Sequence, residues 1–131
     1  MTFAPFSEES MKKLDRIAGT NKDLNISYQY PKVLREVADE RTRQHAKFGE
    51  QNWPDGSGQW STWAAWAEYA KWLCDQKKNL GTLTFLDILW EEVCEAFAEA
   101  DSAKLRAELI QVAALAVQWI EAIDRRKRND I

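Results

Sequence analysis

Four acidic residues in two neighbouring stretches of the chain could together bind a metal ion. Glu91, Glu92 and Glu95 form an EExxE pattern, and Glu108 follows in the next stretch. Residues three and four apart share one face of a helix, so Glu92 and Glu95 point the same way if this stretch is helical. Converging carboxylates repel one another unless a cation neutralises them, and their hard oxygens suit Mg²⁺, Mn²⁺ or Ca²⁺ rather than zinc. Because Mg²⁺ commonly takes phosphate oxygens as further ligands, the pattern also points to a phosphate substrate.

The alternative is an acidic helix surface that only meets solvent, which is common. Spacing alone leaves the two interpretations balanced. The neighbouring apolar residues favour the metal site, because Glu92, Glu95 and Glu99 form a column beside the apolar stripe of their helix, and Glu108 lies at the edge of the next stripe. Antiparallel packing of the two helices through small residues would bring Glu92, Glu95 and Glu108 together. The small residues are Ala96, Ala100, Ala113 and Ala116.

The apolar spacing predicts five helices, at about residues 7–18, 31–48, 61–78, 84–100 and 103–126. Glycine is expected to end helices at Gly49 and Gly81, and Thr84 is expected to cap one, with Asp87 three residues on. No segment alternates with the period of a strand. We therefore predict an all-α helical bundle, in which residues 1–30 form an N-terminal helix and arm and residues 31–128 form the main domain. The last two helices are expected to form an antiparallel hairpin that holds the metal site.

Composition and charge indicate which partners and which cellular location to expect. The chain has 131 residues and a net charge of −3, and its basic run, residues 125–128, is confined to the C-terminal region. Nucleic acid is therefore not an expected partner, because phosphate binding needs a broad basic surface. The longest apolar run, residues 112–117, is much shorter than the roughly 20 residues of a membrane span, so no membrane partner is expected. No signal-peptide pattern opens the chain and the two cysteines lack metal-site spacing, so a cytoplasmic protein is expected.

Residues 88–96 and 106–111 resemble the MazG-like all-α nucleotide pyrophosphatase superfamily, which carries EExxE on one helix and ExxD on the next. Residues 40–51 resemble the first core helix of a short subgroup of that superfamily, common in actinobacteria and their phages. The resemblance covers roughly residues 32–126. It implies Mg²⁺-dependent hydrolysis of a (deoxy)nucleoside triphosphate or related nucleotide to monophosphate and pyrophosphate, with Mn²⁺ as a possible substitute. It also implies a homodimer or homotetramer.

The resemblance further implies roles for individual residues. Glu92, Glu95, Glu108 and Gln111 would bind metal, and Glu91, Glu92 and Glu95 would serve catalysis. Gln111 departs from the pattern, because it stands where the superfamily has a metal-binding Asp. An amide oxygen can bind a cation but brings no negative charge. The alternative function is therefore a nucleotide-binding protein that sequesters its ligand on the same scaffold with little or no turnover.

Substrate contacts are expected from cationic and aromatic side chains. Arg43, Lys47 and Lys71 are candidates for phosphate contact, with Gln44 beside the first two. Trp53 lies in a loop rich in Pro and Gly and is the candidate for stacking on a base. Trp63 and Trp66, three residues apart, are instead expected to pack in the core. A third possibility is a structural bundle that meets a protein partner through its Trp-rich face.

Overall fold

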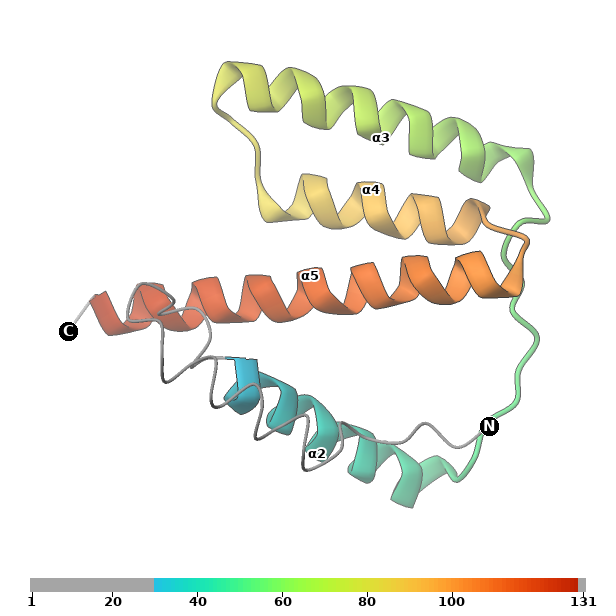
Figure 1. Cartoon of the computed structure of the whole chain (residues 1–131), viewed down its shortest axis with the longest axis vertical. Coiled ribbons are helices and arrows are strands. Elements are labelled where there is room, and N and C mark those ends of the chain that lie inside the picture. Colours follow the sequence, from blue (N-terminus) through green and yellow to red (C-terminus); the bar gives the residue numbers. More distant parts are fainter. Residues whose placement is uncertain (1–29, 130–131) are drawn as a thin grey trace. The chain divides into compact units, whose positions relative to one another are not determined.

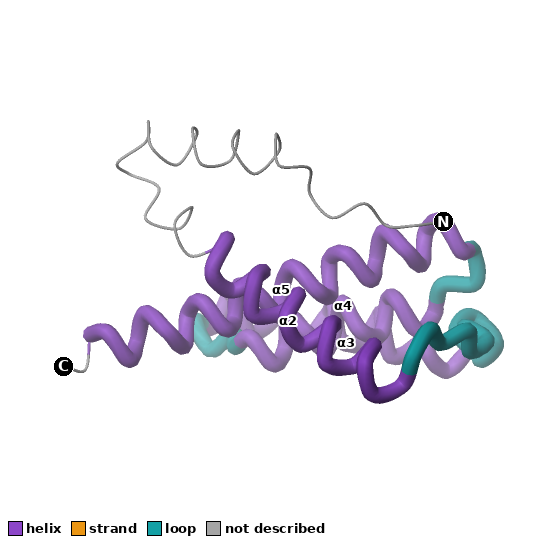
Figure 2. Tube along the Cα trace, turned by 90° about the horizontal axis from the view of Figure 1, so that it is seen from below, coloured by secondary structure: helices purple, strands orange, loops and turns teal. Residues whose placement is uncertain are grey.

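The computed structural model describes residues 30–129, and these form four α-helices without a strand (Figures 1 and 2). The helices are α2 (Tyr30–Phe48), α3 (Ser61–Leu80), α4 (Phe85–Ala98) and α5 (Ser102–Asn129). They confirm the all-α prediction and four of the five predicted helices to within a few residues. The helix predicted at residues 7–18 lies outside the described residues. None of the four helices is both long and apolar enough to span a membrane.

The chain divides into two compact units, Met1–Gly49 and Glu50–Ile131. Helix α2 belongs to the first unit and α3, α4 and α5 belong to the second. Helix α2 ends at Phe48, and the next residue, Gly49, has a positive φ of 68° and donates its N–H to the His45 carbonyl at 2.8 Å. The predicted domain of residues 31–128 stays a prediction.

Helices α3, α4 and α5 form a single layer, with α4 between the other two and antiparallel to both (Figure 1). Within the described part of the chain α3 and α5 do not contact each other, so this unit is an open three-helix layer rather than the predicted bundle. Several of its buried side chains are small, which lets the helices approach closely; they include Ala70, Cys74, Cys94 and Ala96. Aromatic pairs add contacts at both seams: Trp63 with Phe97, and Phe85 with Trp119.

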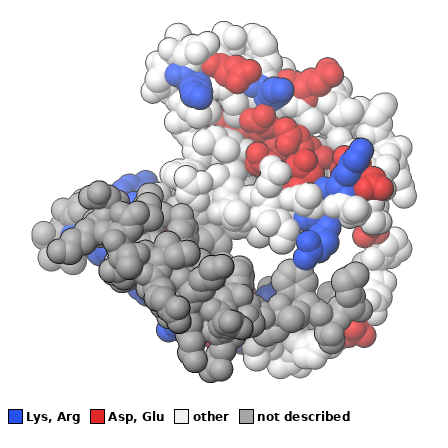
Figure 3. Space-filling view, viewed as in Figure 1, with Lys and Arg blue, Asp and Glu red and all other residues white. Residues whose placement is uncertain are grey.

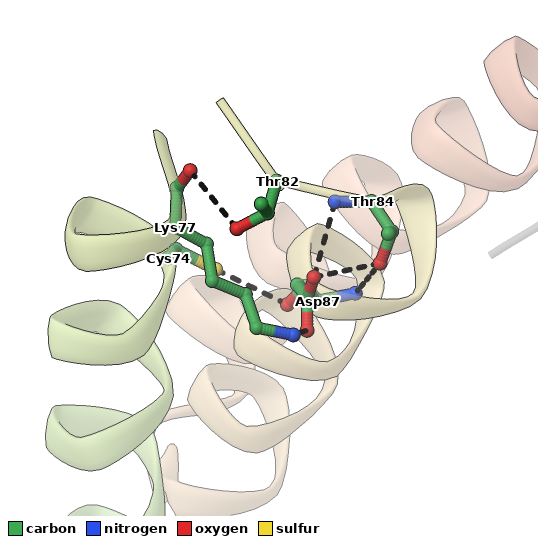
Figure 4. A network of polar contacts seen from close by, with 5 residues as sticks. All are labelled: Cys74, Lys77, Thr82, Thr84 and Asp87. Atoms are coloured by element: carbon green, nitrogen blue, oxygen red, sulfur yellow. Dashed lines mark hydrogen bonds and ion pairs between the residues drawn. The ribbon is translucent and has the colours of Figure 1, made fainter. Parts of the chain in front are cut away.

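A network of polar side chains fixes the junction between α3 and α4 (Figure 4). Thr84 and Asp87 form the predicted capping box, in which each side chain bonds to the backbone N–H of the other residue. Asp87 is buried and forms a 2.9 Å ion pair with Lys77. Its backbone carbonyl accepts a hydrogen bond from the Cys74 thiol. Hydrogen bonds from Thr84 and Lys77 hold the pKa of the Asp87 carboxyl below its ordinary value. This buried acid is fully partnered, so its role is to set the start of α4 against α3.

Gly58, in the loop before α3, brings this loop into contact with the end of α4. Its N–H donates to the Phe97 carbonyl at 2.8 Å, and its φ is +72°. A Cβ on Gly58 would lie 2.4 Å from the Ala100 Cα, whereas a Cβ on Gly56, with nearly the same φ of +73°, would meet open space. Only the absence of a side chain at Gly58 lets the loop that carries Trp53 approach α4 this closely.

The two glycines form a matched pair for testing this contact. We expect Gly56→Ala to cost about 1 kcal/mol through the left-handed backbone alone. Gly58→Ala should cost roughly 2 kcal/mol more, because the loop must also move away from Ala100. Urea unfolding of the two variants measures the difference. Equal losses would show that the close approach contributes nothing to stability.

Candidate metal centre

Three glutamates from two helices converge on one point of the layer. Glu92 and Glu95 come from α4 and Glu108 comes from α5, and each offers a carboxylate oxygen within 4.8 Å of the others. All three residues are partly buried. The antiparallel hairpin of α4 and α5 produces this convergence, as predicted. We call Glu92, Glu95 and Glu108 the acidic cluster.

The turn between α4 and α5 sets the register of the cluster. Helix α4 ends at Ala98, and Glu99 adopts an extended backbone. The Glu99 carboxylate accepts the Asp101 N–H at 3.1 Å, and the Asp101 carboxylate accepts the Lys104 N–H at 3.0 Å, in the first turn of α5. The predicted column therefore stops at Glu95. Glu99 is bonded to the turn instead of extending the column, because α4 is shorter than its apolar pattern suggested.

Burial and mutual repulsion make the acidic cluster costly while it is charged. Burial, followed by the charges of Glu92 and Glu108, raises the pKa of Glu95 to about 7. The pKa of Glu92 is also raised, by burial first and then by Glu108. The Oε2 atoms of Glu92 and Glu108 are buried and accept no hydrogen bond from the described residues. Buried oxygens without donors are the sites at which a cation would offset the desolvation of the carboxylates.

The donor set fits a hard divalent cation. Three carboxylate oxygens on one side suit Mg²⁺, Mn²⁺ or Ca²⁺, each of which accepts further oxygen ligands from water or phosphate. In Figure 3 acidic side chains gather over α4 and α5, with basic side chains on either side.

The other two predicted residues of the site lie at its margins. Gln111 is exposed on α5, one turn beyond Glu108. Glu91 is partly buried and close enough to Glu92 and Glu95 to contribute to their raised pKa values. It also lies against the Cys74 thiol, whose pKa rises to about 12 because of burial and then the hydrogen bond with Glu91. Cys74 is therefore a neutral thiol at physiological pH and not a nucleophile.

The substrate residues predicted on α2 belong to the first unit, and there they make local pairs. Arg43 forms a 2.7 Å ion pair with Glu40, Gln44 accepts a 2.7 Å hydrogen bond from Arg41, and the Lys47 ammonium lies 5.1 Å from the centre of the Phe48 ring. All of these side chains are exposed. Their relation to the acidic cluster stays a prediction.

The second unit carries the two remaining substrate candidates. Lys71 is exposed and follows the buried Ala70 on α3. The register of α3 directs Lys71 to the same side of the layer as Glu95. Trp53 is 79% exposed. Both side chains are accessible, and their roles in substrate binding stay predictions.

Two features were not anticipated from the sequence. Trp66, expected in the core, is 45% exposed, whereas Trp63 is partly buried against Phe97. A hollow of about 900 Å³ lies at the other end of the α4–α5 seam, and none of its lining residues belongs to the acidic cluster; it is lined by Phe85, Trp119, Arg125 and neighbours. No local signal in the sequence pointed to this hollow.

Comparison with protein-family models, curated proteins and solved structures finds no match. The resemblance to the MazG-like superfamily therefore rests on the residues alone.

The raised pKa of Glu95 has a measurable effect on stability. From the ordinary value of 4.5 up to about 7, the folded chain keeps a proton that the unfolded chain has lost. Without metal, the free energy of unfolding should therefore fall as the pH rises through this range. Glu95→Gln removes the charge, so we expect it to raise the unfolding free energy of the metal-free protein at about pH 8 by on the order of 2 kcal/mol, and by much less near pH 5.

The exposed acid Glu68 on α3 supplies the control, because Glu68→Gln should change stability little at either pH. Chemical unfolding in chelator at both pH values gives the comparison. An equal effect of Glu95→Gln at the two pH values would mean that packing, and not repulsion, governs the site.

Proposed function

We propose that the chain is a divalent-metal-dependent hydrolase that splits a (deoxy)nucleoside triphosphate or related nucleotide into monophosphate and pyrophosphate. One observation carries the proposal: three partly buried carboxylates converge, and two of their buried oxygens lack donors among the described residues. A structural acid of this chain, Asp87, is instead paired and has a lowered pKa. The cluster is costly to the fold, and costly acids gather where a protein binds ligands.

The residues divide the work as follows. Glu92, Glu95 and Glu108 would hold the cation, with Mg²⁺ as the expected ion and Mn²⁺ as a substitute. When bound, the cation supplies charge neutralisation for the phosphate oxygens and polarisation of the attacking water. Glu91 lies next to the cluster without being part of it, so it is our candidate for the group that accepts the proton of the water.

Bond changes in the reaction are simple. The water oxygen forms a bond to the α-phosphorus, the bond from that phosphorus to the bridging oxygen breaks, and pyrophosphate leaves. Lys71, on the cluster side of α3, would contact phosphate oxygens, and Trp53 would stack on the base. Arg43, Gln44 and Lys47 on α2 complete the proposed set of substrate residues.

Pyrophosphate release from a panel of nucleoside triphosphates tests the activity. We expect release that depends on Mg²⁺ or Mn²⁺, and a loss of at least about 100-fold in Glu92→Gln, because the site then lacks one of its three charges. Glu68→Gln is the matched control, because Glu68 is an exposed acid on α3 outside the acidic cluster. Normal turnover in Glu92→Gln, or equal loss in Glu68→Gln, would remove the cluster from the reaction.

A second candidate function is nucleotide binding without turnover. Gln111 favours it, because it is neutral and exposed and so adds no charge to the acidic cluster. In that case calorimetry would detect nucleotide binding in Mg²⁺, but prolonged incubation would yield no pyrophosphate. Gln111→Asp should then create turnover, or raise weak turnover by about 10-fold or more, by adding a fourth carboxylate. If Gln111→Asp leaves the rate unchanged, the fourth position has no part in the chemistry.

A further inference from the structure

The hollow at the other end of the α4–α5 seam is separate from the acidic cluster. Trp119, on its wall, and Glu108, in the cluster, both belong to α5 and lie about 16 Å apart along the helix axis. The volume of the hollow, about 900 Å³, is in the range of pockets that hold small molecules. At this end of the layer α5 continues past the start of α4 (Figure 1), and the hollow opens to solvent. A small molecule could therefore bind here independently of the metal centre.

Two aromatic rings form an ordered wall of the hollow. Phe85 of α4 and Trp119 of α5 are partly buried and stacked, with ring centroids 5.8 Å apart and planes 13° apart. Phe85 is the first residue of α4, and the capping box of Thr84 and Asp87 fixes the helix at that position. Further apolar contacts come from Leu83, Leu86, Ile88 and Ala122. Helix packing and the cap already hold this wall in place, so a ligand need not order it on binding.

The charged side chains that line the hollow are both cationic. They are Arg125 and Arg126, and none of the other lining residues is charged. Asp87 lies between two lining residues in the sequence, but its carboxylate bonds to Thr84 and Lys77 instead. An apolar wall beside guanidinium groups complements a molecule that has an apolar body and an anionic group.

Arg126 is better placed than Arg125 to bind an anion. Its Nε–H donates to the carbonyl of Ala122 at 3.4 Å, and Ala122 also lines the hollow. No other described residue accepts a hydrogen bond from Arg126. Arg125 instead lies near the buried Glu121: burial raises the pKa of that carboxyl, and the charge of Arg125 opposes the rise. The terminal nitrogens of Arg126 can therefore donate to both oxygens of a carboxylate or phosphate.

We propose that this hollow binds a small organic anion, a molecule with an apolar body of ring size and one carboxylate or phosphate group. The body packs against Phe85 and Trp119, and Arg126 donates to the anionic oxygens. This proposal does not rest on the proposed function, because the hollow shares no residue with the acidic cluster.

Titration of the isotope-labelled full chain with three naphthalene probes tests the site. The probes are naphthoate, naphthyl phosphate and the neutral naphthalenemethanol, and a chelator keeps metal from the acidic cluster. The indole N–H resonance of Trp119, assigned with Trp119→Phe, reports binding at the hollow. We expect at least one anion to shift it and to bind at least about 10-fold more tightly than the alcohol, which forms no charge-assisted bonds with Arg126. The tighter anion identifies the preferred headgroup.

Two variants separate the charge from the apolar wall. Arg126→Gln should weaken the binding of the anions by about 10-fold, to the level of the alcohol. Lys127→Gln is the matched control, because Lys127 belongs to the same basic run but does not line the hollow. It should leave the affinity unchanged. Phe85→Leu should weaken all three probes by about 5-fold and keep the preference for the anion, with an unchanged helical circular dichroism spectrum.

Several results would overturn the proposal. Equal affinity for the anions and the alcohol would mean that the hollow is only an apolar surface, and anion binding by Arg126→Gln at the wild-type level would mean the same. Shifts at the indoles of Trp66 and Trp90 without one at Trp119 would place the probes elsewhere on the layer. Absence of any shift at millimolar probe would show that the hollow is not a ligand site.

Discussion

The close antiparallel packing of α4 against α5 is the constraint on which the candidate site depends. Ala96, on the side of α4 that faces α5, is 1% exposed, and its small side chain lets the two helices approach closely. The turn at residues 99–101 then fixes the register, because Glu99 and Asp101 bond to its backbone. Close approach and fixed register together bring Glu108 to Glu92 and Glu95. A larger side chain at Ala96 would separate the helices, and with them the carboxylates.

This packing places carboxylates that repel one another side by side. A comparison of two acids on α4 shows how this differs from an acid that stabilises the fold. Asp87 and Glu95 lie on the same helix; Asp87 is buried and Glu95 is partly buried. Asp87 has donors for both carboxylate oxygens and its pKa is lowered, whereas Glu95 faces other carboxylates and its pKa rises to about 7. The first acid stabilises the fold, and the second is stabilised only by a proton or a cation. A fold that contains both kinds gives a physical reason to assign structure to one and ligand binding to the other.

The sequence predicted local features well, because their causes are local. The capping box of Thr84 and Asp87 and the helix end at Gly81 follow from short-range hydrogen bonds and backbone freedom. The convergence of Glu92, Glu95 and Glu108 was also predicted, since stripe edges on two short-connected helices fix their relative position. Features that depend on distant residues were missed. The contact of Gly58 with Ala100 joins segments far apart in the chain. The early end of α4 was also missed, because the apolar pattern continues past Ala98, whereas Glu99 bonds to the turn instead of continuing the helix.

The tryptophans show the same limit. Their spacing on α3 indicated an apolar face, and the structure contains that face, but a periodic pattern does not specify what covers it. Trp63 and Trp119 lie within the layer, in ring contact with Phe97 and Phe85, whereas Trp66 and Trp90 contact each other where both rings stay partly exposed. Helix α4 contributes to both sides of the layer, with Glu92 and Glu95 toward one and Trp90 and Phe97 toward the other. Because the same helix supplies two of the three carboxylates, a contact that covers its aromatic side would also restrain the candidate site.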